Sequence, residues 1–142
     1  MATVELSFTA LPAHVRTARL VATAVARRSG VDESLLDEVR LAVGEACTRA
    51  VEGHQLYCPA EPVRLALTDL AGRFEVEVTD NLSDESSGAG RQRGVTDGHD
   101  GAGLPAGLGI AVIEGLADDV QICATPDGTR IRMSWPSAGA TR

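Results

Sequence analysis

The sequence has few aromatic residues, no excess of basic charge and no long apolar run. Only 3% of its 142 residues are aromatic, and 13 basic side chains against 20 acidic ones give a net charge of −7. Nucleic-acid binders usually have a basic surface and aromatic side chains on which bases stack. No apolar run approaches the roughly 20 residues that cross a bilayer, and no signal peptide is visible. We therefore expect a cytoplasmic protein that binds neither nucleic acid nor a membrane.

Paired cysteines and clustered metal ligands are also missing. The three cysteines are Cys47, Cys58 and Cys123. An odd number without paired spacing favours neither a disulfide framework nor a zinc site. Asp97, His99 and Asp100 fall in a stretch with no rigid element, which favours a solvated loop over a metal site. The chain is long enough for one domain with a real core, built from Val, Leu, Ile and Ala.

The hydrophobic pattern predicts five strands and three helices. Apolar and polar residues alternate in the strand segments, whereas apolar residues recur at steps of three and four in the helical ones. The expected strands are 4–8, 63–68, 74–79, 120–123 and 129–135, and the expected helices are 11–29, 32–53 and 107–117. Three helices cannot cover both faces of such a sheet. We therefore predict an α+β two-layer sandwich, a mostly antiparallel sheet with the helices on one face.

A long glycine-rich stretch separates the third strand from the last helix. Residues 82–106 contain six glycines and show no apolar period. A loop of this length is uncommon in a compact domain unless it is a lid, a binding loop or a disordered segment. We expect one domain of residues 1–136, in which 82–106 form a flexible lid-like loop, and a frayed tail of residues 137–142.

Three separate blocks carry the chemistry of a binding site. They are Glu45-Ala46-Cys47-Thr48-Arg49-Ala50-Val51, Thr79-Asp80-Asn81-Leu82 and Gly107-Leu108-Gly109-Ile110. Taken alone, the spacing of Glu45 and Arg49 is typical of a solvated helical salt bridge. Glycines at a helix N-terminus let backbone amides approach an anion, and the helix dipole favours phosphate there. We expect the three blocks to meet where the loop-rich edge of the sandwich reaches the central helix.

In order and spacing, the blocks resemble the GHKL (Bergerat-fold) ATPase superfamily and, within it, the bacterial anti-sigma-factor serine kinases. Those kinases carry Glu-Ala-Cys-Thr-Asn-Ala-Val on a helix, Asp-Asn-Gly after a strand and Gly-Leu-Gly-Leu at a helix start. The segment 128–133 is also similar to the final strand of the family. The resemblance extends from the first strand to about Trp135.

The resemblance implies a role for each matching residue. Asp80 is expected to accept a hydrogen bond from the adenine amino group, with Asn81 beside it and Thr129 near the base. The phosphates are expected at Gly107, Leu108 and Gly109. Glu45 is expected to be the general base that acts on a serine of a partner protein. The implied partners are a sigma factor and an anti-sigma antagonist, in the control of transcription during a stress response, and the implied assembly is a homodimer.

Two departures from the family pattern fall in the site itself. Arg49 replaces the Asn that coordinates Mg²⁺, and an arginine has no acceptor for a metal ion. Arg49 either contacts phosphates directly or pairs with Glu45 and removes the general base from use. Leu82 replaces a glycine and is expected to put an apolar side chain near the adenine pocket.

These departures predict a regulator that binds a sigma factor or an antagonist, with ATP binding and kinase activity impaired or lost. ATP is then a doubtful ligand and Mg²⁺ is not expected. Arg49 is counted among the residues that would bind the cofactor, and no metal ligands are predicted. The alternative is an active Mg-ATP-dependent protein serine kinase that tolerates Arg49. A GHKL-type domain with some unrelated signalling partner is a more distant reading. A sensor histidine kinase is less favoured, because no phosphoacceptor helix pair or membrane segment is visible.

Overall fold

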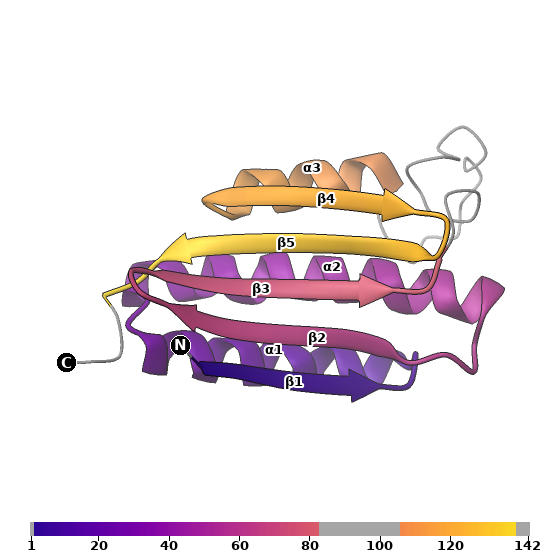
Figure 1. The fold of residues 1–142 in the computed structure, drawn as a ribbon, viewed down its shortest axis with the longest axis horizontal. Helices are drawn as coiled ribbons and strands as arrows, with labels where there is room; N and C mark the ends of the chain where they lie inside the picture. Colours follow the sequence, from indigo (N-terminus) through magenta and orange to yellow (C-terminus); the bar gives the residue numbers. More distant parts are fainter. Residues whose placement is uncertain (1, 83–105, 139–142) are drawn as a thin grey trace.

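A computed structural model of the chain describes residues 2–82 and 106–138. In this part of the chain, five strands form one antiparallel sheet in the order β1-β2-β3-β5-β4, and the helices lie on one of its faces (Figure 1). The elements are β1 (Ala2–Phe8), α1 (Pro12–Ser29), the 3-10 helix η1 (Glu33–Leu35), α2 (Leu36–Tyr57), β2 (Val63–Leu70), β3 (Arg73–Asp80), α3 (Ala106–Leu116), β4 (Asp119–Thr125) and β5 (Gly128–Pro136). The predicted α+β two-layer sandwich is confirmed.

The central helix α2 differs from its prediction at both ends. Asp32 does not cap α2 but the preceding turn η1, where its Oδ2 accepts a hydrogen bond from the Ser34 N–H at 3.0 Å. At the other end α2 passes Gly53 and continues to Tyr57. The pattern predicts that the helix ends at Gly53, yet this glycine lies inside α2, where a side chain would collide with Leu82. Composition alone does not separate these two uses of a glycine.

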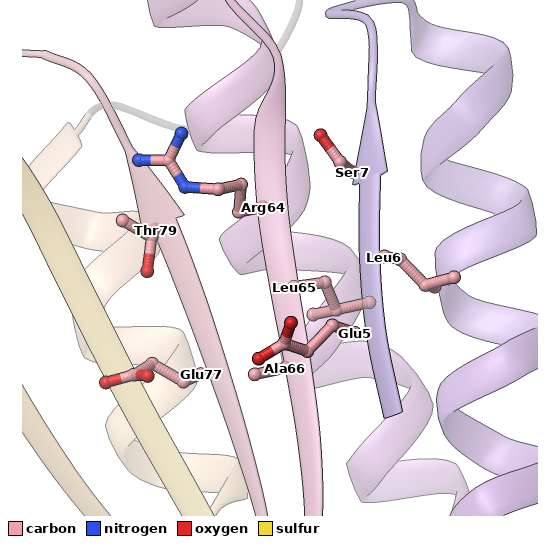
Figure 2. Close-up of a pocket in the computed structure, with 8 residues that line it drawn as sticks. All are labelled: Glu5, Leu6, Ser7, Arg64, Leu65, Ala66, Glu77 and Thr79. Atoms are coloured by element: carbon pink, nitrogen blue, oxygen red, sulfur yellow. The ribbon is translucent and has the colours of Figure 1, made fainter. Parts of the chain in front are cut away.

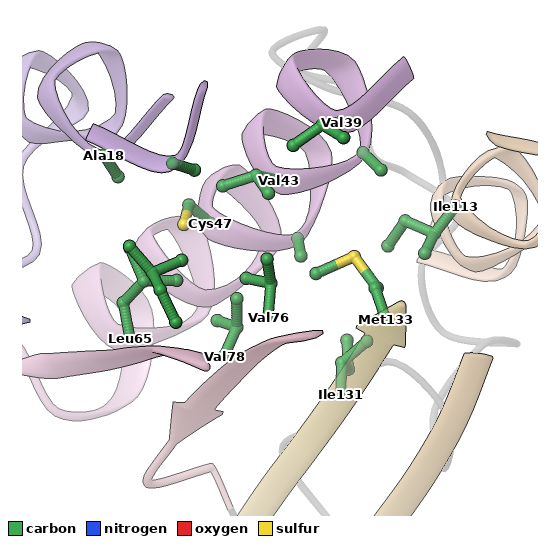
Figure 3. Close-up of a cluster of buried hydrophobic side chains, with 14 of the residues drawn as sticks. Ala18, Val39, Val43, Cys47, Leu65, Val76, Val78, Ile113, Ile131 and Met133 are labelled. Atoms are coloured by element: carbon green, nitrogen blue, oxygen red, sulfur yellow. The ribbon is translucent and has the colours of Figure 1, made fainter. Parts of the chain in front are cut away.

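The core lies between the helices and the sheet and is mainly aliphatic. Figure 3 shows side chains of α1, α2 and α3 meeting those of β2, β3 and β5, with Val43 and Cys47 of α2 near the middle. Two of the few aromatic residues contribute as well. Phe74 and Trp135 are fully buried, and their ring centroids lie 6.4 Å apart. Trp135 Nε1 donates to the Leu116 carbonyl at 3.2 Å, so its polar atom is paired.

The order of the strands places distant segments side by side. Because β5 lies between β3 and β4, the end of β3 is opposite the start of β5, and Asp80 pairs with Thr129. The predicted lid, apart from its ends, falls on 83–105, outside the described residues. Beyond β5, the Ser137 N–H donates to the Gly72 carbonyl and the Ala138 N–H to the Gly30 carbonyl. No helix in the described part is long and apolar enough to cross a membrane.

Candidate functional site

The three blocks meet around the middle and the C-terminal half of α2. Arg49 of α2 reaches Asp80 at the end of β3, with 3.0 Å between Nη1 and Oδ2. Glu45, one turn earlier, lies against Gly109 of α3, where an added Cβ would be 2.9 Å from Glu45 Oε2. Gly107 and Leu108 belong to the first turn of α3, but their contacts fall outside what is described. The expected meeting of the three blocks is therefore observed at two points.

Asp80 is the most fully partnered polar group at this site. Its side chain is 2% exposed, and Oδ1 accepts hydrogen bonds from the backbone N–H groups of Leu82 at 2.9 Å and Thr129 at 3.0 Å. Its other oxygen, Oδ2, accepts from Arg49. Both carboxylate oxygens are thus engaged by groups of the chain itself. Three of the roughly four acceptor positions of the carboxylate are thus used, and a bound base would have to share Oδ2 with Arg49.

Arg49 makes an ion pair that the sequence does not predict. The pairing with Glu45 is wrong, because the ion pair of Arg49 in the described structure is with Asp80 on another element. The two side chains are 11% and 2% exposed, so the pair is buried. Breaking a buried pair of this kind leaves an uncompensated charge, which costs about 3–5 kcal/mol. This salt bridge therefore differs from the solvated helical pair that the spacing alone suggested.

Two polar atoms beside this ion pair lack a partner. Arg49 Nε and Thr129 Oγ1 are buried and make no hydrogen bond within the described residues. Buried polar atoms normally find a protein group or an ordered water. Thr129 also donates its backbone N–H to Asp80, so both unpaired atoms belong to residues that contact the same carboxylate.

His54 fixes the end of β3 to α2. Its ring is fully buried, and Nε2 accepts a hydrogen bond from the Asn81 backbone N–H at 2.9 Å. Since Nε2 accepts, the proton of the neutral ring is assigned to Nδ1, which lies 2.8 Å from the Glu61 carbonyl and donates to it. The sequence gives no role to His54, because a histidine on an apolar helix face has no motif of its own. It is nevertheless the group that positions Asn81 and, through it, Asp80.

Leu82 takes the place of a glycine without needing the backbone freedom of a glycine. The backbone at this position needs no left-handed conformation, because none of the described non-glycine residues has a positive φ. The Leu82 side chain is 2% exposed and packs onto Gly53 of α2, where a Cβ would approach Leu82 Cδ1 to 2.3 Å. A large residue at 82 is therefore matched by the smallest residue at 53. This complementarity links two positions that the sequence pattern treats separately.

Gly128, at the start of β5, makes the approach to Asp80 possible. A Cβ at this position would lie 2.1 Å from the Asp80 backbone carbonyl oxygen. Any side chain would thus push β5 away from the end of β3. Only with this close approach does the Thr129 N–H reach the Asp80 carboxylate.

Glu45 has a more open environment than Asp80. Its side chain is partly buried, and this desolvation raises the pKa of the carboxyl group. Burial also raises the pKa of Glu52, two turns further along α2, with a smaller contribution from the charge of Glu45. Glu45 forms no ion pair with another described residue. A carboxyl group with a raised pKa suits general base chemistry near neutral pH better than an ordinary one.

The residues present do not fit a magnesium ion in the manner of the resembled kinases. Magnesium takes oxygen ligands, and the group at position 49 is a guanidinium that is already paired with the nearby carboxylate. Within the described residues, no three His, Cys, Asp or Glu side chains cluster as metal ligands do. The carboxylate oxygen that the resemblance assigns to the adenine amino group, Oδ2 of Asp80, already accepts a hydrogen bond from Arg49.

The opposite face of the sheet carries an open hollow of about 410 Å³. Figure 2 shows it over β1, β2 and β3, with the small Ala66 between the carboxylates of Glu5 and Glu77. The core and the helices lie on the other face, so the hollow is separated by the sheet from Glu45, Arg49 and the buried carboxylate. None of the residues that line it belongs to the three blocks except Thr79, whose side chain points away from the core.

Comparison with known proteins agrees with this geometry. Residues 8–135 match the model of the histidine kinase-like ATPase domain. A crystal structure of the RsbU and RsbW domains of Rv1364c from Mycobacterium tuberculosis is similar, with a TM-score of 0.67 and 18% sequence identity over 95% of this chain. The chain corresponds to 32% of that longer protein. No curated protein matches the sequence. Because the family model covers nearly all of the sandwich, the chain belongs to the histidine kinase-like ATPase domain family.

Proposed function

We propose that this protein is an anti-sigma-type regulator that acts by binding a protein partner, with ATP binding and kinase activity lost or strongly impaired. The partner is a sigma factor, an anti-sigma antagonist, or both in turn. The protein acts in the cytoplasm, as a homodimer, and its output is the control of transcription, as in a stress response. The observation that carries the proposal is the buried ion pair between Arg49 and Asp80.

The ion pair argues against nucleotide binding in two ways. The guanidinium donates to the carboxylate the hydrogen bond that an adenine amino group would otherwise donate. Its positive charge also replaces an amide oxygen that Mg²⁺ would need. Binding ATP would therefore require Arg49 to leave a buried partner, at a cost of several kcal/mol before any contact with the ligand forms.

The choice of partner class rests on the family and on the resemblance of the three blocks. The chain has a histidine kinase-like ATPase fold, and its similarity to a protein containing an RsbW domain agrees with the resemblance to anti-sigma kinases. At 18% identity this similarity supports the fold rather than a particular partner. A regulator that keeps such a fold without nucleotide exchange would hold its partner through surface contacts alone.

An active protein kinase is the second candidate, and Glu45 favours it. This carboxyl group keeps the position of the general base, its pKa is raised by burial, and Arg49 does not pair with it. The catalytic half of the site is thus less altered than the half that would hold the base. For this candidate, Arg49 must move away when Mg-ATP binds.

A gain-of-function substitution separates the two candidates. Arg49→Asn removes the guanidinium and restores the amide of the resembled kinases, and Arg40→Asn is the matched control, because Arg40 forms an exposed pair with Asp37 on the same helix. We expect ATP binding to appear in Arg49→Asn and to stay absent in the wild type and in Arg40→Asn. Leu82 packs on Gly53, so we expect no second substitution to be needed.

The protein partner is tested with purified sigma factors and antagonists from the source organism. The proposal expects one of them to bind with an affinity that ATP, ADP and Mg²⁺ leave unchanged. Transfer of phosphate from ATP to an antagonist by the wild type would establish the kinase instead. Binding of none of the candidates would reject the anti-sigma role while leaving the conclusion on ATP untouched.

A further inference from the structure

We infer that the edge of β4 that lacks a strand neighbour among the described residues binds the β4 strand of a second copy of this chain, joining two five-stranded sheets into one. In the described structure, β4 pairs with β5 alone, so its outer row of backbone N–H and C=O groups has no ladder partner there (Figure 1). Such an edge is a template for another strand unless charge, proline or a bulge protects it. This inference rests on the homodimer of the proposed function, whose interface it names, and does not depend on the proposed loss of ATP binding.

The sequence of β4 lacks the usual protection of an edge. All seven residues of Asp119–Thr125 pair with β5 in a continuous register without a bulge. Between Asp119 and Asp127 no residue is charged, and the one proline, Pro126, lies beyond the strand. Ile122 is 39% exposed although its neighbour across the ladder, Ile131, is buried in the core. A continuous edge with no charge in its centre and no bulge is a template for pairing with another strand.

A two-fold pairing of β4 with itself matches residue types on both faces. Ile122 is the midpoint of the strand, so an antiparallel pair centred on it aligns all seven residues of both copies. On the core side, Ile122 then meets Ile122 of the partner subunit, and Val120 meets an alanine, Ala124. On the other side, uncharged Gln121 meets a cysteine, Cys123, and the terminal aspartate meets a threonine. No like charges face each other.

The other edge of the same sheet shows what prevents this pairing. β1 also has one strand neighbour, β2, and its apolar residue Val4 is 40% exposed, nearly the same fraction as Ile122. The midpoint of β1, however, is Glu5. A two-fold pair of β1 strands would place two carboxylates directly opposite each other, which is destabilising. The two edges therefore differ in charge at the point where a symmetric partner would meet them, and β4 is the one that fits a second copy.

The equal exposure of Ile122 and Val4 supplies a matched pair of variants. Ile122→Lys places two like charges at the centre of the proposed pair, whereas Val4→Lys adds the same charge to the opposite edge. Sedimentation velocity over a wide range of concentration should show the wild type and Val4→Lys in a monomer–dimer equilibrium based on the 14.8 kDa chain. In Ile122→Lys the dissociation constant should rise about tenfold or more. A monomeric wild type, or equal constants for the two variants, would overturn the inference.

A covalent test covers the case in which Ile122→Lys fails to fold. In the proposed register, position 121 lies opposite Cys123 of the partner subunit. Gln121→Cys in a Cys58→Ser background should give a disulfide-linked dimer under mild oxidation, because the remaining thiol, Cys47, is buried. The matched control is Ser7→Cys in the same background, which adds an exposed thiol to the β1 edge. Cross-linking of both variants to the same extent, or of neither, would contradict the pairing of β4 with itself.

Discussion

The two halves of the site, around Asp80 and around Glu45, differ in how completely the chain satisfies its own polar groups. Asp80 is 2% exposed and accepts hydrogen bonds from Arg49, Leu82 and Thr129. Glu45 is partly exposed, has a raised pKa and forms no ion pair within the described part of the chain. The half that would bind the base is closed by the protein itself. The half that would carry the general base leaves its carboxyl group without an ion pair in the described residues.

The difference indicates which half of the site contributes to the packing of the protein itself. Three contacts around Asp80 depend on residues that fit one another: Arg49 with the carboxylate, Leu82 with Gly53, and His54 with the Asn81 backbone. A site that merely lost its ligand would not need such complementarity. The Asp80 half therefore has a structural role of its own, and substitutions there should change the stability of the protein more than substitutions elsewhere.

The largest effect is expected from Asp80→Ala. Removing this carboxylate leaves the Arg49 guanidinium buried without its partner and two backbone N–H groups without an acceptor. We expect the free energy of unfolding to fall by about 3–5 kcal/mol, measured by urea denaturation. Asp118→Ala is the control, because its pair with Arg73 is exposed and should cost no more than about 1 kcal/mol. Similar losses in both variants would remove the distinction between the two halves.

The next effect concerns the contact of Leu82 with Gly53. In Gly53→Ala the new methyl group collides with Leu82, so we expect a loss of about 1–3 kcal/mol although alanine favours a helix. Gly115→Ala in α3 meets no atom within 4 Å and should instead gain up to about 1 kcal/mol. In a double-mutant cycle, Leu82→Ala should cancel most of the penalty at position 53. If the losses of stability in Gly53→Ala and Leu82→Ala simply add, the side chain of Leu82 does not pack tightly against position 53.

The smallest effect is the pH dependence due to Glu45. Its pKa in the folded state is raised above the ordinary value of 4.5, so the folded state binds a proton that the unfolded state has released. The stability of the wild type relative to Glu45→Gln should therefore fall as the pH rises from 4.5 through the raised pKa, and then become constant. Chemical denaturation of both proteins at a series of pH values measures this difference. If the stability of the wild type relative to Glu45→Gln rises with pH instead, the ionised carboxylate of Glu45 has a stabilising partner.

The sandwich could be predicted from the sequence because its signals are local. Alternating strands, the turn glycines and the helical apolar stripes each depend on neighbouring residues, and the five strands and three helices follow from them. The extension of α2 past Gly53 was missed because the reason for that glycine, Leu82, lies 29 positions away in the sequence. The same holds for His54, whose partners are the Asn81 N–H and the Glu61 carbonyl.

The site could be predicted only in its outline. The sequence predicts the blocks around Arg49 and Asp80, but the contacts it predicts for Arg49 are phosphates or Glu45, whereas the ion pair in the described structure is with Asp80. Residues four apart on a helix are neighbours by geometry alone, whereas an arginine side chain is long enough to reach another element. Which of the two carboxylates it reaches depends on burial: Asp80 lies inside the protein, where an unpaired charge costs most.

Isothermal titration of the purified wild type with ATP, with and without Mg²⁺, tests the central claim most directly. The account predicts no heat of binding and an unchanged melting temperature, because Arg49 already occupies the Asp80 carboxylate. The same titration of Arg49→Asn is predicted to show binding. Tight, magnesium-dependent binding of ATP by the wild type would contradict the account. Arg49 would then leave its buried partner readily, and the active protein kinase would be the better interpretation.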